Sequence, residues 1–319
     1  MPGFYTHYLF GAMTFPQLTN ARTKSILKNN KAVYTYGLQG PDFLFYFLPS
    51  QILHSGNLGS TMHERRTGCF LNHLINTRNE FVSQEERDIA ECYILGFIGH
   101  YVLDSVAHPY IYDRSGFVFQ KTQRYYSRHI ELETEIDSDL LDYYKHRKPS
   151  QFPQYRLLTL TPQQRMVISA CLTKALKKTY PEKFLNTGMM RMALSWMRSG
   201  THLFADKNGW KKPMVRHIEN RIFGYYPISF MIPTNQGNDF IDPTNILRDS
   251  WKNPWKPERS SNETFYEVFE RAQKQYLELI HATEQVFASG TTSFSTTSIA
   301  AWRKLIGNKS YHSGLSCDL

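Results

Sequence analysis

The sequence predicts an all-α protein, with a single multi-helix domain over residues 1–290 followed by a linker and short basic tail over residues 291–319. Three observations support this prediction. Apolar residues recur at helical spacing along most of the chain. Residues that commonly begin helices precede several of these runs. Alternation of apolar and polar residues, which is typical of half-buried strands, is scarce.

The clearest helix start is a capping-box signature, with Ser83 followed three residues later by Glu86. We expect this helix to run to about Ala107 and to end before Pro109, because proline cannot supply the helical N–H. A Thr-Pro pair at residues 161 and 162 predicts a second helix start. Further helices are expected over residues 17–29, 43–48, 58–77, 122–146, 184–205, 211–223 and 262–288.

Two segments are less regular. The aromatic run at residues 43–48 could also form a buried strand, but it shows no alternation and has no neighbouring strand, so a buried helix is favoured. Residues 225–260 are rich in Pro, Gly, Asn and Asp, which predicts a long irregular connection. Loops of that length inside a compact domain are often functional.

Composition restricts the class of protein. Hydrophobic residues make up 41% of the chain and aromatic residues 14%, which is enough for a large core and excludes a disordered chain. The net charge of +9 favours anionic partners, such as phosphate esters, acidic lipid surfaces or nucleic acid. The four cysteines show no CxxC spacing, so a thiolate zinc site is not expected. We see no signal peptide and no uninterrupted apolar stretch long enough to span a membrane, so a cytoplasmic protein is expected.

The segment from His100 to His108 has the spacing of a metal site. His100, Asp104 and His108 are four residues apart, and each such step advances a helix by about 400°, so the three side chains share one face. Two imidazoles and a carboxylate are ligands that zinc accepts. Two hydrogen-bonded histidines on a buried helix would be the alternative, but an unpaired Asp104 would then be costly to bury.

The next expected helix carries a second pair of this kind, His129 and Glu133. Pairs at this spacing are common on exposed helices, and this one gains weight from its place directly after the first three residues. Asp137 extends the same stripe, as a carboxylate behind the ligands or as ordinary surface charge. Upstream, the further candidates are His7, Asp42 after the Gly40-Pro41 turn, and His63, while His54 and His73 compete with His63.

These segments also resemble a known family. The stretches HYLFG, GPDFLFY, LGSTMH, GFIGHYVLDSVAHPYI and HIELE occur in the order found in bacterial zinc-dependent phospholipases C, which belong to the phospholipase C/P1 nuclease-like superfamily. The resemblance implies an all-helical fold, a cluster of up to three zinc ions, and cleavage of phospholipid to diacylglycerol and a phosphorylated head group. Phospholipid or a peripheral membrane surface is then the expected partner.

The resemblance also assigns roles to the candidate residues. It implies that Asp42, His63, His100 and Asp104 hold one zinc ion, that His108, His129 and Glu133 hold a second, and that His7 and a bridging Asp104 contribute to a third. Secreted members bind one zinc through an N-terminal Trp, whereas this sequence begins Met1-Pro2-Gly3, so two or three ions are expected. If one oxygen of Asp42 is free of metal, it could orient or deprotonate the attacking water.

Two other functions stay open at this point. A zinc-dependent nuclease of the related fold would use the same ligands and the same basic charge, although nucleic acid is the less favoured partner. A non-catalytic metal-binding protein is the second alternative, and the absence of the N-terminal Trp permits it.

Overall fold

The computed structural model describes residues 3–49, 57–117, 122–226, 228–235, 239–289 and 296–317. Within these residues the protein is helical, with a single two-stranded antiparallel hairpin, as the sequence predicts. The α-helices are α1 (Phe4–Thr14), α2 (Ala21–Asn29), α3 (Lys31–Leu38), α5 (Leu58–Glu64), α6 (Thr67–Asn76), α7 (Gln84–Arg114), α8 (Gln123–Lys145), α9 (Pro162–Thr179), α10 (Thr187–Leu203), α11 (Lys211–Ile222), α12 (Phe265–Ala288) and α13 (Thr296–Ile306). The strands are β1 (Trp251–Asn253) and β2 (Lys256–Ser261).

Short 3-10 helices join several of these elements. They are η1 (Phe15–Gln17), η2 (Gly40–Leu44), η3 (Thr77–Glu80), η4 (Pro149–Gln151), η5 (Gln154–Leu158) and η6 (Ser229–Met231).

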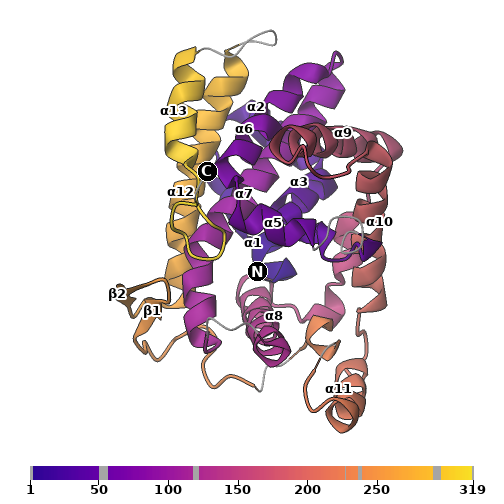
Figure 1. Ribbon diagram of the computed structural model, residues 1–319, viewed down its shortest axis with the longest axis vertical. Coiled ribbons are helices and arrows are strands. Elements are labelled where there is room, and N and C mark those ends of the chain that lie inside the picture. Colours follow the sequence, from indigo (N-terminus) through magenta and orange to yellow (C-terminus); the bar gives the residue numbers. More distant parts are fainter. Residues whose placement is uncertain are drawn as a thin grey trace.

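Helix α7 forms the centre of the molecule. Every residue from Ile89 to Tyr112 is buried, and a helix that is buried on all sides is expected to be largely apolar all round. Helices α3 and α12 pack along it, and α9 covers another side (Figure 1). Helix α7 is also the one described helix long and apolar enough to cross a membrane, but its apolar stretch lies entirely inside the protein. It therefore serves as a core helix.

Helices α3 and α7 meet with their backbones in contact. A Cβ atom on Gly37 would lie 2.5 Å from the Tyr93 carbonyl oxygen, and one on Gly96 would lie 2.6 Å from the Tyr34 carbonyl oxygen. Only glycine at both positions allows this approach. The contact holds the end of α3, and the η2 turn that follows it, directly against the central helix.

Several helix ends follow the expected chemistry. The hydroxyl of Ser83 accepts a hydrogen bond from the Glu86 N–H at the start of α7, and Thr161 and Gln164 cap each other at the start of α9. Helix α7, however, does not end before Pro109 as expected, but continues to Arg114. Proline removes one backbone hydrogen bond, and burial of the surrounding turns on all sides outweighs that loss.

Two other sequence expectations differ from the structure. Residues 43–48 do not form a buried helix, because the chain makes the tight η2 turn at Gly40-Pro41, and Leu48 is 60% exposed. The helix expected over residues 58–77 is divided into α5 and α6 at Arg66, which has the left-handed backbone angle φ of 55°. The Arg66 guanidinium donates to the Thr179 carbonyl at 2.7 Å, and this long-range contact stabilises the break.

Helix α13 lies in the segment where the sequence predicts a short basic tail. Residues 296–317 pack into the main body, with Trp302 and Tyr311 fully buried. The Trp302 indole donates to Thr283 of α12 at 2.9 Å. Two large aromatic side chains thus anchor this segment in the core.

Candidate metal centre

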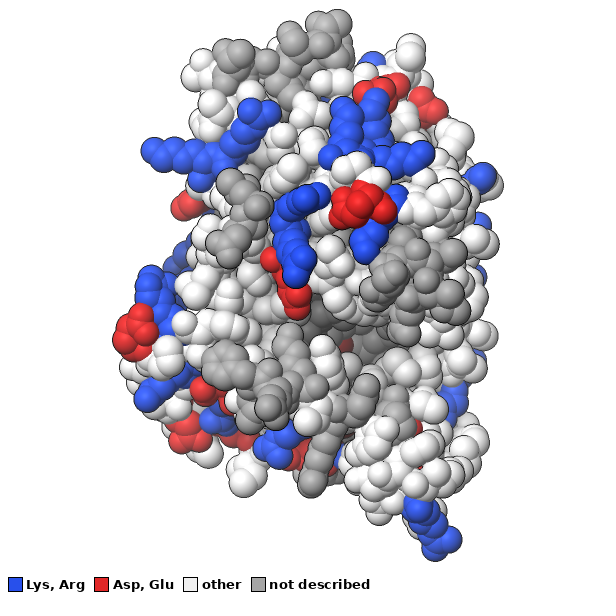
Figure 2. All heavy atoms as spheres, viewed as in Figure 1, with Lys and Arg blue, Asp and Glu red and all other residues white. Residues whose placement is uncertain are grey.

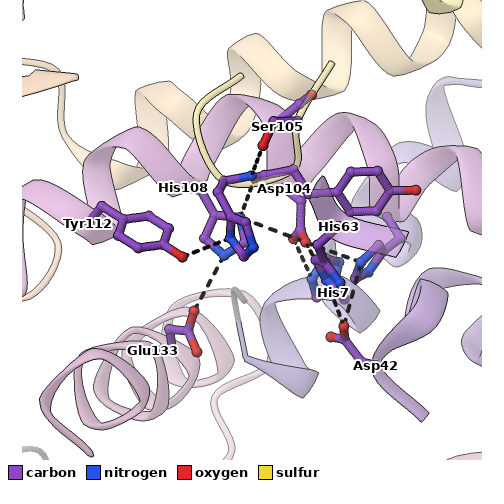
Figure 3. Close-up of polar contacts among 12 residues, drawn as sticks. His7, Asp42, His63, Asp104, Ser105, His108, Tyr112 and Glu133 are labelled. Atoms are coloured by element: carbon purple, nitrogen blue, oxygen red, sulfur yellow. Dashed lines mark hydrogen bonds and ion pairs between the residues drawn. The ribbon is translucent and has the colours of Figure 1, made fainter. Parts of the chain in front are cut away.

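Asp104 lies at the centre of a buried cluster of histidines. One of its carboxylate oxygens, Oδ1, is 3.1 Å from His7 Nε2. The other, Oδ2, is 3.1 Å from His100 Nε2 and 3.5 Å from His63 Nε2. His108 Nδ1 lies 3.7 Å from the same oxygen. Four imidazoles from α1, α5 and α7 thus surround one carboxylate, as Figure 3 shows for His7, His63 and His108.

Asp42 closes this cluster from the η2 turn. Its Oδ1 lies 3.2 Å from His63 Nε2 and 3.7 Å from His100 Nε2. The turn fits against the cluster because Gly40 has a φ of +50° and no side chain, and its Cα faces the His100 ring. A Cβ atom there would lie 2.1 Å from His100 Cδ2. The turn therefore positions Asp42 only as long as residue 40 is glycine.

A second group lies one turn further along α7. His129 Nε2 is 3.1 Å from Glu133 Oε1, and His108 Nε2 is 3.7 Å from the same oxygen. The two imidazole rings are stacked, with centroids 5.9 Å apart. Figure 3 shows Glu133 on the facing helix, on the side of His108 opposite the first cluster. Helices α7 and α8 thus provide a second set of donors adjoining the first, with Asp104 and His108 between the two.

Backbone carbonyls orient three of the histidines. Nδ1 of His63 lies 2.7 Å from the Gly59 oxygen, Nδ1 of His100 lies 3.1 Å from the Leu38 oxygen, and Nδ1 of His108 lies 2.6 Å from the Tyr311 oxygen. A carbonyl only accepts, so each Nδ1 carries a proton, and in the neutral ring each Nε2 presents a lone pair to the carboxylates of the two donor groups. This tautomer is the one that a metal ligand requires.

The cluster contains buried polar atoms whose hydrogen-bonding capacity is not used. The Nε2 atoms of His7, His63, His100 and His108, Oδ1 of Asp42, and both carboxylate oxygens of Asp104 make no hydrogen bond of acceptable geometry. Buried polar groups are normally hydrogen-bonded, and each exception is costly. Convergent imidazole nitrogens and carboxylate oxygens are the usual donors for zinc. The residues present therefore fit zinc.

Burial and charge also set the protonation of these groups. Burial lowers the pKa of His7 and lowers that of His108 to about 4, so both rings are neutral at neutral pH. Burial likewise opposes charge on His63, but the carboxylates of Asp104 and Asp42 outweigh it and raise its pKa to about 9. Neutral imidazoles are ready to bind a cation. His63 has to release a proton to do so.

Two of the remaining sequence candidates, His73 and Asp137, lie outside the cluster. His73 Nδ1 contacts the Thr179 hydroxyl at 2.9 Å and has a structural role, while His54 lies outside the described residues. Asp137 accepts hydrogen bonds from the Tyr5 and Thr6 backbone N–H groups at 2.9 and 2.6 Å, so it caps α1. Asp137 therefore fixes the helix that carries His7, a role that neither sequence interpretation included.

Sequence reasoning also missed the contribution of the C-terminal segment. Besides the Tyr311 carbonyl, it brings in His312, whose ring stacks on that of His63 with centroids 5.6 Å apart. His312 Nδ1 lies 2.7 Å from the Tyr112 hydroxyl. These contacts join residues that are some 200 or more positions apart in the chain, and a backbone carbonyl has no sequence signature. No local pattern could have revealed them.

The cluster opens into a cavity of about 360 Å³. Asp42, His129, Glu133 and His312 contribute polar atoms to its wall, whereas much of the remaining lining is apolar, including Phe4, Phe45, Tyr46, Ile130, Met197, Phe230 and Met231. A hollow is visible on the face shown in Figure 2, with Lys and Arg side chains gathered above it. A pocket with few convergent polar groups and an apolar wall is typical of a small-molecule site.

Comparison with known families agrees with this geometry. The model of the family described as zinc-dependent phospholipase C matches residues 6–187, which is more than half of the chain. The chain belongs to the zinc-dependent phospholipase C family. No curated protein matches it significantly, and no solved structure does so either.

In this zinc-dependent phospholipase C family member, the matched segment contains all eight candidate ligands from His7 to Glu133. Tyr311 and His312 lie beyond the match. The part of the chain that the family model covers thus supplies the donors, and the C-terminal segment supplies the carbonyl that orients His108.

Proposed function

We propose that the protein hydrolyses the phosphodiester bond of a phospholipid and releases diacylglycerol and a phosphorylated head group. The observation that carries this proposal is the pair of adjoining donor groups, with Asp104 and His108 at their junction, at the wall of a cavity with a largely apolar lining. A merely structural zinc site would have no need of such a cavity, because structural sites are closed.

The proposed ligands divide between two or three zinc ions. His63, His100 and Asp104, together with Asp42, would hold one ion, and His108, His129 and Glu133 would hold a second. His7 faces Asp104 Oδ1 and would join it on a third ion where that ion binds. Bound zinc would supply positive charge for the phosphoryl oxygens and lower the pKa of an attacking water.

Asp42 is the proposed general base. Of the three proposed carboxylate ligands, Asp104 and Glu133 lie on α-helices and Asp42 lies on a 3-10 turn. Asp42 also contributes both to the donor cluster and to the cavity wall. A carboxylate in that place can accept the proton of a water that attacks the phosphorus, and the Gly40-Pro41 turn keeps it in position. Asp104 is fully buried behind it and is suited to bridging.

The cavity also favours a lipid substrate. Its volume of about 360 Å³ is close to the lower end of the range for small-molecule pockets, so we infer that it takes a head group and the glycerol backbone while the acyl chains stay outside. The apolar residues at its wall, such as Phe230 and Met231, would contact the start of those chains.

The test is turnover by the zinc-loaded protein on phosphatidylcholine, on single-stranded nucleic acid and on bis(p-nitrophenyl) phosphate, beside the Asp42→Asn variant. We expect release of diacylglycerol and the phosphorylated head group by the parent and loss of turnover in the variant. Preferential cleavage of nucleic acid would favour the nuclease of the related fold. If none of the three substrates is cleaved by a protein that binds zinc, the non-catalytic alternative replaces the proposal.

A further inference from the structure

Helix α11 has its polar and apolar faces the wrong way round for a helix on the surface of a water-soluble protein. Such a helix normally buries its apolar stripe and exposes its charges. In α11 the buried residues are Lys212 and Glu219, whereas Met214, Ile218 and Ile222 are 45%, 49% and 65% exposed. These three apolar residues are four positions apart and therefore form one continuous outer stripe.

The inner face of α11 is held by ion pairs and hydrogen bonds. Lys212 Nζ is 2.6 Å from Glu131 Oε1 of α8, and both side chains are only 7% exposed. The Glu219 carboxylate accepts hydrogen bonds from the backbone N–H groups of Ile228 and Ser229. The helix is thus anchored in one orientation by specific contacts. Exposure of its apolar stripe is a property of the fold.

The exposed charge on residues 203–223 has one sign, and the neighbouring carboxylate of Asp239 is paired with Arg216 at 2.7 Å. Residues 203–223 contain two carboxylates, and both are turned inward: Asp206 accepts the N–H groups of Gly209 and Lys212, and Glu219 accepts those of η6. The exposed charged residues Lys207 and Arg221 are cationic. An apolar stripe beside cationic side chains matches the surface of a bilayer that contains anionic lipid.

Further exposed apolar side chains flank α11 in the chain. Leu203 at the end of α10 is 68% exposed, Trp210 directly before α11 is 56% exposed, and Phe223 directly after it is 51% exposed. Tryptophan is favoured at the level of lipid head groups. In Figure 2 the lobe where Figure 1 places α11 lies below the hollow and is largely uncharged, with a cationic side chain at its tip.

We propose that α11 docks this protein onto an anionic lipid surface, with Met214, Ile218 and Ile222 inserted among the lipids. The inference rests on the proposed function and specifies how its substrate is reached. Glu219 ties α11 to the η6 backbone, and η6 carries Phe230 and Met231 of the cavity wall. Docking through α11 therefore places the lipid surface beside the cavity.

The test compares two glutamate variants of the full-length, zinc-loaded chain. Ile218→Glu places a charge in the stripe, and Met166→Glu places the same charge on exposed Met166 of α9, which lies far from α11. Binding is measured by sedimentation with vesicles of phosphatidylcholine and phosphatidylglycerol. We expect Ile218→Glu to bind about 10- to 100-fold more weakly, since burial of one Ile is worth roughly that factor. Met166→Glu should bind like the parent.

Turnover separates docking from catalysis. On monomeric dihexanoyl-phosphatidylcholine all three proteins should be equally active, whereas on vesicles Ile218→Glu should lose turnover in step with binding. If the parent binds vesicles through Ile218 but cleaves no phospholipid, docking stands and the proposed function fails. If the parent cleaves both substrates and Ile218→Glu is unaffected, docking fails and the function stands.

Other results overturn the proposal directly. The first is failure of the parent to sediment with the vesicles, and the second is an equal loss of vesicle binding in both glutamate variants. The third is a parent that does not bind vesicles but forms a dimer, seen by light scattering, that Ile218→Glu dissociates. Zinc content and circular dichroism check that the variants are folded. Should Ile218→Glu misfold, Ile218→Ala decides the question, because it keeps the helix and should still bind more weakly than the parent.

Discussion

Replacement of Gly40 by alanine tests how the η2 turn assembles the metal centre. An added Cβ would lie 2.1 Å from His100 Cδ2, whereas ordinary contact begins at 3.4 Å, so the turn and the ring have to separate by 3.4 − 2.1 = 1.3 Å. The His100 ring is fully buried and is held by the Leu38 carbonyl, so it has little room to move. Zinc–nitrogen distances tolerate only about 0.2 Å.

We therefore expect Gly40→Ala to lose zinc from the group formed by Asp42, His63, His100 and Asp104, and to lose at least about 100-fold in turnover, the scale of a 1 Å misplacement. Zinc per chain by elemental analysis and turnover on phosphatidylcholine measure the two effects. The left-handed backbone alone costs alanine about 1–2 kcal/mol, and that cost has to be measured separately.

Gly116→Ala is the matched control. Gly116 also has a positive φ, of +74°, but nothing lies within 4 Å of an added Cβ atom. This variant should lose a similar amount of stability, with a fall in melting temperature of about 2–4 °C, and keep its zinc and turnover. Equal zinc content and turnover in Gly40→Ala and Gly116→Ala would refute the reasoning, because the clash with His100 would then have no consequence.

Three further predictions follow from the same cluster. Asp42→Asn should keep most of its zinc and lose at least about 100-fold in rate, the scale for a general base. Asp104→Asn should lose both its zinc and its activity. Zinc content measured beside turnover distinguishes the two variants, and an active Asp42→Asn would exclude Asp42 as the base. Because the pKa of His63 is raised to about 9, its stabilising charge in zinc-free protein is fully present below its ordinary pKa of about 6.5 and is lost as pH rises through 9. The melting temperature of the chelated protein should thus fall as pH rises from about 6.5 to 9. Over the same range, zinc affinity should rise by up to about tenfold per pH unit. Calorimetry and zinc titrations that show no pH dependence would contradict this. A chain that ends at residue 307 lacks the Tyr311 carbonyl that orients His108 and the His312 ring that stacks on His63, so it should lose zinc from both donor groups; unchanged zinc content would show that the C-terminal segment is dispensable for the metal centre.

Local sequence was sufficient for the helical class and for much of the donor set. Helical spacing predicts that His100, Asp104 and His108 share one face, and in the structure both imidazoles lie within 3.7 Å of the Asp104 carboxylate. The same holds for His129 and Glu133, which are one turn apart on α8. Side chains three or four residues apart on a helix lie together whatever the helix packs against. Their ligation of zinc stays a prediction.

Other features depended on packing between distant segments. Pro109 ends an isolated helix, yet α7 continues past it because its neighbours bury it on every side. The run 43–48 is apolar enough for a helix, but Gly40 and Pro41 turn the chain tightly where it meets His100. In both cases the local backbone preference for ending or continuing a helix, worth a few kcal/mol, competes with the burial of large side chains. Only the tertiary structure shows which of these two contributions is larger.

The sequence by itself determined which residues could bind zinc and which of them share a helix face, because helical periodicity is a property of the local backbone. The tertiary structure decided that α1, η2, α5, α7 and α8 bring those residues to one point, that the Tyr311 carbonyl orients His108, and that α11 faces outward with its apolar side. These features arise from contacts between residues far apart in the chain. Closing such long chain segments costs entropy, and only burial of the whole assembled core offsets that cost.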